Sequence, residues 1–201
     1  MIPANPGERR QEVNIREFIE DKVAEIKKTV GEEKAISALS GGVDSSVCTV
    51  LAHRAIGHGL KGIFIDDGLM REAEPQQVQE TFGKLGIGVD IVDAQAEFFE
   101  ALAGKLDPEE KRKAFRQTFY SVFGREVRKS RARFLIQGTI AADIIETKGG
   151  VKTQHNILEQ IGIDPEKGFG FRVVEPIKEL FKHEVRRVAK GLGLPESVYR
   201  R

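Results

Sequence analysis

Short apolar runs alternate along this chain with longer segments whose apolar residues recur at helical spacing. The runs are residues 34–39, 61–66, 89–92, 134–137 and 173–174. Strands separated by helices predict a parallel sheet with right-handed crossovers. Strands that are apolar throughout are typical of a sheet covered on both faces. The sequence therefore predicts an α/β fold with a doubly wound, mostly parallel sheet of about five strands.

Several helix ends carry recognisable signals. Asn14 followed by Glu17 forms a capping-box pattern, and Gly31 ends the same helix. Pro75 and Pro108 stand where proline is tolerated, in the first turn of a helix. We expect helices near 14–30, 47–57, 75–85, 98–102, 108–131 and 177–192. Residues 1–12 are polar and are expected to form a flexible tail, with residues 13–201 as one domain.

Composition narrows the class of protein. Lys and Arg number 32 against 31 Asp and Glu, so the net charge of +1 argues against a nucleic-acid partner. The single cysteine, Cys48, forms no intrachain disulfide and fits a reducing compartment, so we expect the cytoplasm. No apolar stretch approaches the ~20 residues of a membrane span, and the N-terminus lacks the apolar core of a secretory signal.

A glycine- and serine-rich run, Ser40-Gly41-Gly42-Val43-Asp44-Ser45-Ser46, joins the first strand to the next helix. Its glycines allow a tight turn, and its hydroxyls and free helix-start amides suit an anion. The run contains no lysine, so it is not a Walker loop, and an ordinary strand-to-helix turn is the alternative. The loops at 66–68 and 138–139 follow other strands, so three loops converge on the edge of the sheet where such folds bind ligands. The run therefore predicts a phosphate-binding loop.

The same run resembles the signature of the PP-loop ATP pyrophosphatase superfamily. Further blocks, FIDDGLMR, LDPEEKRK, LIQGTIAADIIET, VKTQHN, VVEPIKELFKHEVR and LGLPESVYRR, occur in the order found in the GMP synthetase family. They resemble its ATP pyrophosphatase domain, most nearly the form in which that domain is a separate subunit.

The resemblance implies an ATP-dependent ligase that uses ATP and Mg²⁺. It would transfer AMP to the C2 oxygen of xanthosine 5′-monophosphate (XMP) with release of pyrophosphate, and ammonia would then give GMP. The implied partners are a glutamine amidotransferase subunit and a second copy of the chain.

The resemblance also implies roles for particular residues. ATP would be held by Ser40, Gly41, Gly42, Val43, Asp44, Ser45, Ser46, Ile65, Gly138 and Thr139. Asp44 would also hold Mg²⁺, and Asp44, Lys152 and Lys182 would act in catalysis. Lys152 matches the family's lid lysine.

The chain also departs from the family pattern. It ends at Arg201, where the family continues into a dimerisation domain, and the lid carries Gln154 in place of a histidine. An excised synthetase part, a paralogue with another acceptor such as a carboxylate, and a non-catalytic ATP-binding module all remain open. A tRNA-modifying enzyme is disfavoured by the neutral charge and the absence of a second cysteine.

Other polar residues allow more than one interpretation. Cys48 is expected to be buried rather than sulfur-carrying, and the histidines show no zinc-ligand spacing. His155 matches a lid histidine or is a solvated loop residue, and Asp143 with Glu146 faces the substrate or caps a helix. The run at 111–113 is expected to be a solvated, internally paired helix face, with docking as the alternative.

Overall fold

The computed structural model describes residues 13–71, 73–148 and 172–200. The elements in chain order are α1 Ile15–Val30, β1 Ala35–Leu39, α2 Val43–Ile56, η1 Gly57–Gly59, β2 Leu60–Asp66, α3 Glu74–Gly83, β3 Val89–Asp93, α4 Gln95–Leu102, α5 Pro108–Ser130, β4 Phe134–Ile136, α6 Ala141–Lys148, β5 Arg172–Val174, α7 Lys182–Gly191 and α8 Glu196–Tyr199. None of the described helices has the length and apolar content that crossing a membrane requires.

The described strands form one five-stranded sheet in the order β3-β2-β1-β4-β5. Every pairing between neighbouring strands is parallel, which confirms the predicted fold class. The chain winds outward from β1 to β3 and then continues with β4 on the other side of β1. The direction of winding thus reverses between β1 and β4, and sheets of this kind bind ligands at such a reversal, beyond the carboxyl ends of the strands.

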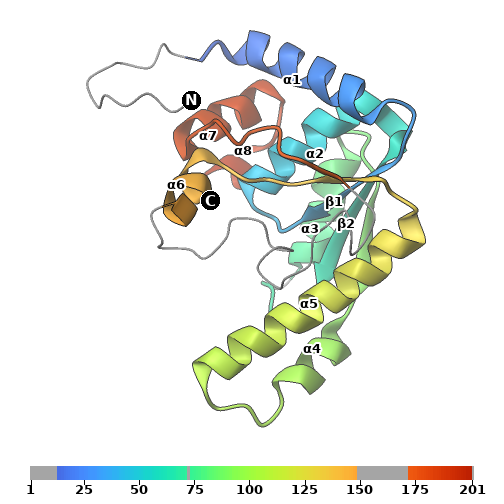
Figure 1. Cartoon of the computed structure of the whole chain (residues 1–201), viewed down its shortest axis with the longest axis vertical. Coiled ribbons are helices and arrows are strands. Elements are labelled where there is room, and N and C mark those ends of the chain that lie inside the picture. The colour runs from blue at the N-terminus through green and yellow to red at the C-terminus, as the bar shows by residue number, and fades with distance from the viewer. Residues whose placement is uncertain (1–12, 72, 149–171, 201) are drawn as a thin grey trace.

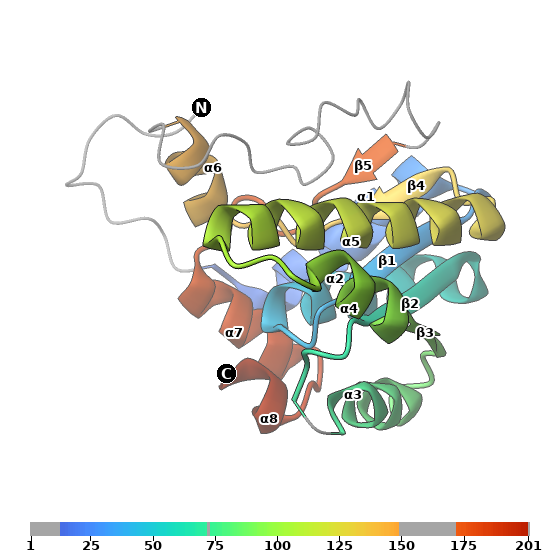
Figure 2. The same ribbon diagram turned by 90° about the horizontal axis from the view of Figure 1, so that it is seen from below.

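Helices cover both faces of the sheet (Figure 1). Buried residues of α1, α2, α3 and α7 share one apolar core with one side of the strands. Buried residues of α4 and α5 share a second core with the other side. Figure 2 shows α5 lying lengthwise across that second face, with α4 beside it. Because helices bury both faces of the sheet, its strands are apolar throughout.

The helix α2 lies deep in the first core and carries the end of the phosphate-binding loop. It is buried over most of its length, which suits a helix placed between α1 and the sheet. One hydroxyl pair joins it to β1: the hydroxyls of Ser37 and Thr49 are 2.8 Å apart, and within the helix Thr49 Oγ1 donates to Ser45 O. The bond between Ser37 and Thr49 satisfies buried polar groups and holds the middle of α2 against the middle of β1.

The predicted start of the last helix was wrong. We expected it at residue 177, but α7 begins at Lys182 and the preceding residues form turns. Ile177 and Leu180 are fully buried in these turns, and Leu180 N donates to Ile177 O over 2.9 Å. An apolar pair three residues apart fits a turn as well as a helix, so the periodicity was misleading. Phe181 is extended and Glu184 Oε2 accepts from its N–H over 2.7 Å, which starts the helix there.

Candidate active site

The loop between β1 and α2 has the backbone of an anion-binding turn. Gly41 has a φ of 72°, a left-handed conformation that favours glycine. Gly42 is the N-cap of α2 and provides no side-chain cap. The first amides of α2 have no partner within the helix and lie at its positive end, so they are available to an anion.

The three serines of the loop have different surroundings. Ser40 is exposed, and its hydroxyl lies 3.1 Å from that of Ser45. Ser45 Oγ also accepts from Ser40 N over 3.3 Å and contacts Gly42 O. Ser46 is buried, and its hydroxyl donates to Gly42 O over 2.7 Å. Ser40 and Ser45 can therefore turn toward a ligand, whereas the Ser46 hydroxyl stabilises the loop itself.

Asp44 and Lys182 are brought together from distant parts of the sequence. Lys182 Nζ donates to Asp44 Oδ2 over 2.7 Å, and both side chains are partly exposed. The other oxygen, Asp44 Oδ1, is buried and has no hydrogen-bond partner among the residues that the structure describes. A buried carboxylate oxygen without a donor fits a cation ligand, because such a group is costly when it has no partner. The described residues contain no group of three or more His, Cys, Asp or Glu that could hold a metal ion. Mg²⁺ is usually bound through one or two carboxylates together with substrate phosphates and waters.

Gly138 and Thr139 close the other side of the loop. A Cβ on Gly138 would lie 3.0 Å from both Asp44 C and Ser45 N, so only glycine allows this approach. Thr139 is 3% exposed, and its hydroxyl donates to Glu175 Oε1 over 2.6 Å. Residue Glu175 did not emerge from the sequence analysis, although its position directly after a predicted strand is the signal that could have found it.

Ile65 lies at the carboxyl end of β2, beyond the point where β1 ends. The register pairs Leu39 with Phe64, so the last residues of β2 extend past β1 and border the loop at residues 40–42. The side chain of Ile65 is buried in the α4–α5 core. Any contact from this position to a ligand in the crevice would therefore come from its backbone.

The loop after β2 is held by its own carboxylates. Asp66 Oδ1 accepts from Gly68 N over 3.0 Å and Asp67 Oδ1 from Leu69 N over 2.8 Å. Gln95 Nε2 donates to Asp66 Oδ2 over 2.8 Å. These carboxylates thus shape the loop that follows the second strand.

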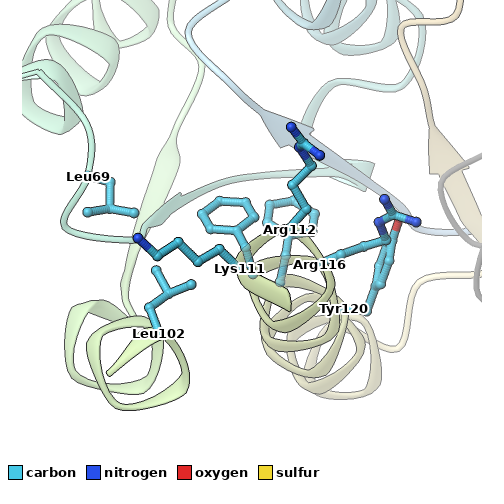
Figure 3. Close-up of a pocket in the computed structure, with 8 residues that line it drawn as sticks. Leu69, Leu102, Lys111, Arg112, Arg116 and Tyr120 are labelled. Atoms are coloured by element: carbon cyan, nitrogen blue, oxygen red, sulfur yellow. The ribbon is translucent and has the colours of Figure 1, made fainter. Parts of the chain in front are cut away.

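A cavity of about 600 Å³ lies beside α5 (Figure 3). It is lined by Leu69, Leu102, Lys111, Arg112, Phe115, Arg116, Phe119 and Tyr120. Burial raises the pKa of Tyr120 to about 12, although the nearby charge of Arg116 opposes the shift. The Tyr120 hydroxyl therefore stays protonated at neutral pH.

The run at 111–113 is exposed, as predicted, and Arg112 pairs with Glu109 in the same helix. Lys111 and Arg112 also line a cavity, which their sequence pattern of an exposed, charged helix face does not reveal. Asp143 Oδ2 accepts from Ile140 N over 3.1 Å, which is the capping interaction that we considered for α6. Cys48 is fully buried, and its thiol contacts Gln137 O at 3.5 Å. Lys152, Gln154 and His155 lie outside the described residues.

Comparison with known proteins places the chain in a family. A family model described as NAD synthase matches residues 12–201. A subunit of the glutamine-hydrolyzing GMP synthase of Archaeoglobus fulgidus is 49% identical over 190 residues, which are 94% of this chain and 60% of the relative. The corresponding subunit of Pyrococcus horikoshii is 50% identical over 185 residues, 92% of this chain and 58% of the relative. The chain thus spans about three fifths of the length of these relatives.

Two solved structures share the fold. An NH3-dependent NAD synthetase from Campylobacter jejuni, in complex with the nitrate ion, matches with a TM-score of 0.70 and 16% identity over 94% of this chain and 78% of that one. An NMN synthetase from Francisella tularensis matches with a TM-score of 0.70 and 17% identity over 94% of this chain and 75% of that one. Since the family model covers nearly the whole chain, the chain belongs to the NAD synthase family of the PP-loop superfamily.

Proposed function

We propose that this chain is the ATP pyrophosphatase part of a GMP synthetase, an ATP-dependent ligase. In the proposed reaction the C2 oxygen of XMP attacks the α-phosphorus of ATP, pyrophosphate leaves, and ammonia then displaces AMP to give GMP. The observation that carries the proposal is the convergence of the loop at residues 40–46 and of Lys182 on the first turn of α2. Relatives about 50% identical to the chain, each named as a subunit of a GMP synthase, support the same reaction.

The loop is suited to bind the pyrophosphate part of ATP. Its first amides, which have no partner within the helix, lie at the positive end of α2, and the Ser40 and Ser45 hydroxyls add donors. Lys182 places a positive charge beside this turn, where negative charge develops as pyrophosphate leaves. The proposed reaction needs no covalent bond between the protein and the substrates, because positioning and charge neutralisation lower the barrier.

Asp44 fits the Mg²⁺ that the reaction requires. Its Oδ1 is a buried acceptor without a partner in the described part of the chain, and Mg²⁺ is bound through one or two carboxylates together with substrate phosphates. When bound, Mg²⁺ would neutralise charge on the phosphates. Asp44 would hold it and Lys182 would flank it.

We place the adenine between the ends of β2 and β4. Ile65 would contact it through its backbone, with Gly138 and Thr139 on the opposite side. Lys152 would reach the phosphates from the family's lid. These roles rest on the family resemblance and on the positions of the three described residues at the crevice edge.

The cavity beside α5 is our candidate for the acceptor site. Three cations, Lys111, Arg112 and Arg116, surround aromatic side chains, which suits a ligand with a phosphate and a planar base. Its volume of about 600 Å³ is that of a small-molecule site. Leu69 lies in the loop after β2, so the cavity borders the same edge of the sheet as the phosphate-binding loop.

The proposed partners follow from the reaction. Ammonia would come from a glutamine amidotransferase subunit, and a second copy of the chain would form the dimer typical of the family. The lone cysteine fits a reducing compartment, so we place the reaction in the cytoplasm.

The deciding experiment is pyrophosphate release from Mg·ATP in the presence of ammonium, with and without XMP. Release that depends on XMP, with GMP formed, is expected. ATP binding without release under any condition would indicate a non-catalytic module, and release stimulated by a carboxylate would indicate another acceptor.

A matched pair of variants tests the cavity. Arg116→Ala should raise the KM for XMP and leave the KM for ATP unchanged, because it removes a phosphate partner from the cavity only. Arg128→Ala is the control, since Arg128 is exposed on the same helix and does not line the cavity.

A further inference from the structure

Gly138 lies close against the backbone of the phosphate-binding loop. A Cβ at this residue would lie 3.0 Å from Asp44 C and Ser45 N and 3.2 Å from Asp44 O. The Ser45 amide belongs to the first turn of α2, whose N–H groups are available to an anion. The position of Gly138 therefore bears directly on the geometry of the amides that would hold phosphate.

The segment that carries Gly138 is short and is fixed on both sides. Gln137 N donates to Val174 O over 2.9 Å, and Cys48 Sγ contacts Gln137 O. On the other side Thr139 is nearly inaccessible, accepts from Gln137 Nε2 over 3.1 Å and donates to Glu175 Oε1 over 2.6 Å. The bond to Glu175 has the length of a charge-assisted O–H···O⁻ bond, the stronger class of hydrogen bond.

Glu175 also begins the segment that leads to Lys182. It follows β5 directly, as Thr139 follows β4 after two residues, and these strands pair in parallel with Ile136 opposite Val174. The turn that starts at Glu175 is tied back to the β4 loop, because Ala141 N donates to Leu180 O over 2.9 Å. Glu175 thus lies where the segment that follows β4 meets the segment that leads to Lys182.

We propose that Glu175 is a positioning residue that acts through the Thr139 hydroxyl to hold Gly138 against the first turn of α2. The inference rests on the proposed function and adds a residue to it. The carboxylate of Glu175 does not have to touch ATP. It fixes the backbone that shapes the phosphate site, and a misplacement of about 1 Å at such a site costs on the order of 100-fold in rate.

The test compares substitutions that remove the bond with substitutions that keep it. Glu175→Leu removes the acceptor and Thr139→Val removes the hydroxyl at nearly constant shape, whereas Glu175→Gln and Thr139→Ser keep one partner atom each. The first two variants should lower the kcat of pyrophosphate release by about 10- to 100-fold and weaken ATP binding by about tenfold, because the displaced amides would hold the phosphates both before and during the reaction. The two conservative variants should recover most of the rate.

Coupling between the two residues gives a second readout. The double variant Glu175→Leu with Thr139→Val should lose no more rate than Thr139→Val alone, because Thr139→Val already breaks the bond to Glu175. Glu179→Leu is the matched control, since Glu179 lies on the same turn and is exposed and paired with Lys22. Its kcat should stay at the wild-type value, and thermal unfolding of all variants should show that they remain folded.

The outcomes separate this inference from the proposed function. A wild-type rate in Glu175→Leu, or additive losses in the double variant, would overturn the positioning role and leave the proposed function standing. If the wild-type chain binds ATP but releases no pyrophosphate, the proposed function fails. The same variants are then compared by ATP titration. A Kd about tenfold weaker in Glu175→Leu and Thr139→Val, but unchanged in the conservative and control variants, supports positioning. Equal Kd values in all the variants overturn it. A wild-type chain that binds no ATP would overturn both.

Discussion

The side chains of Lys182 and Asp44 meet across the site although 138 residues separate them, with Nζ 2.7 Å from Oδ2. Each residue lies in the first turn of a helix, Asp44 in α2 and Lys182 in α7. Both side chains are partly exposed, and such pairs contribute at most about 1 kcal/mol to folding. The pair therefore matters less for stability than for the charges that it places beside the phosphate-binding loop.

Lys182→Met should lower kcat/KM for pyrophosphate release by about 100-fold or more, because a fixed positive charge beside the leaving group is lost. The free energy of unfolding should change by less than about 1 kcal/mol. Steady-state assays and urea titrations measure the two effects. Lys178→Met is the control, since Lys178 is exposed in the turn just before α7. Equal rates in the two variants would remove Lys182 from catalysis.

Asp44→Asn should abolish most turnover while the fold stays intact. The substitution keeps the shape of the side chain but removes the charge that would hold Mg²⁺ through Oδ1. Pyrophosphate release measured against MgCl₂ concentration should require far more Mg²⁺ in the variant, and circular dichroism should be unchanged. A wild-type Mg²⁺ dependence would show that Asp44 does not hold the metal.

The loop serines should separate into ligand-binding and structural roles. Ser40→Ala with Ser45→Ala should weaken ATP binding, because two hydrogen bonds to charged phosphate are lost at roughly 1.5–3 kcal/mol each. Ser46→Ala should instead lower the melting temperature with little change in ATP affinity, because its hydroxyl is buried against Gly42 O. Calorimetric ATP titration and thermal unfolding distinguish the two cases. Equal effects of Ser46→Ala and the double variant on ATP affinity would contradict this division.

The fold was predictable because its signals are local. Apolar runs, helix caps and the glycine-rich loop each depend on neighbours within a few residues, and the strand and helix patterns all favoured one parallel sheet. The start of α7 was one exception, because the spacing of Ile177 and Leu180 suits a turn and a helix equally.

The site was only partly predictable because its contacts join distant segments. The sequence indicated the loop and Asp44, but the position of Glu175 after a strand does not reveal its bond to Thr139 across the sheet edge. In the sequence, the cations of α5 show the pattern of a solvated helix face. Only the packing of α4 and of Leu69 against α5 shows that Lys111 and Arg116 line a cavity.

Gly138→Ala should damage the site more than the fold. The added Cβ would press on Asp44 C and Ser45 N at 3.0 Å, and overpacking of this kind costs about 1–3 kcal/mol. ATP affinity should fall by about tenfold, because the amides at the start of α2 are displaced. Gly83→Ala is the control, since its Cβ would meet nothing within 4 Å. Unchanged ATP binding in Gly138→Ala would show that the loop tolerates this displacement.

Ionisation of Cys48 should lower the free energy of unfolding at alkaline pH. Burial raises the pKa of its thiol well above the ordinary value, and the charges of Asp44, Glu175 and Glu179 raise it further. In the unfolded chain the thiol ionises at its ordinary pKa, so between the two pKa values the unfolded state binds fewer protons and stability falls as pH rises. This contribution is fully present below the ordinary thiol pKa and is lost above it, by up to about 1.4 kcal/mol per pH unit.

Urea unfolding at pH 8 and pH 10 measures that loss. Wild type should lose more stability between the two pH values than Cys48→Ala, which has no thiol to ionise, while the lysines and tyrosines that titrate in the same range affect both alike. Cys48 is the only cysteine of the chain, so reaction with a thiol dye reports on it alone. That reaction should be at least about 100-fold slower in the native than in the denatured protein, because the buried thiol is neither exposed nor ionised. Parallel stability losses in wild type and Cys48→Ala, together with fast labelling of the native chain, would show that the thiol is reached and ionised without unfolding.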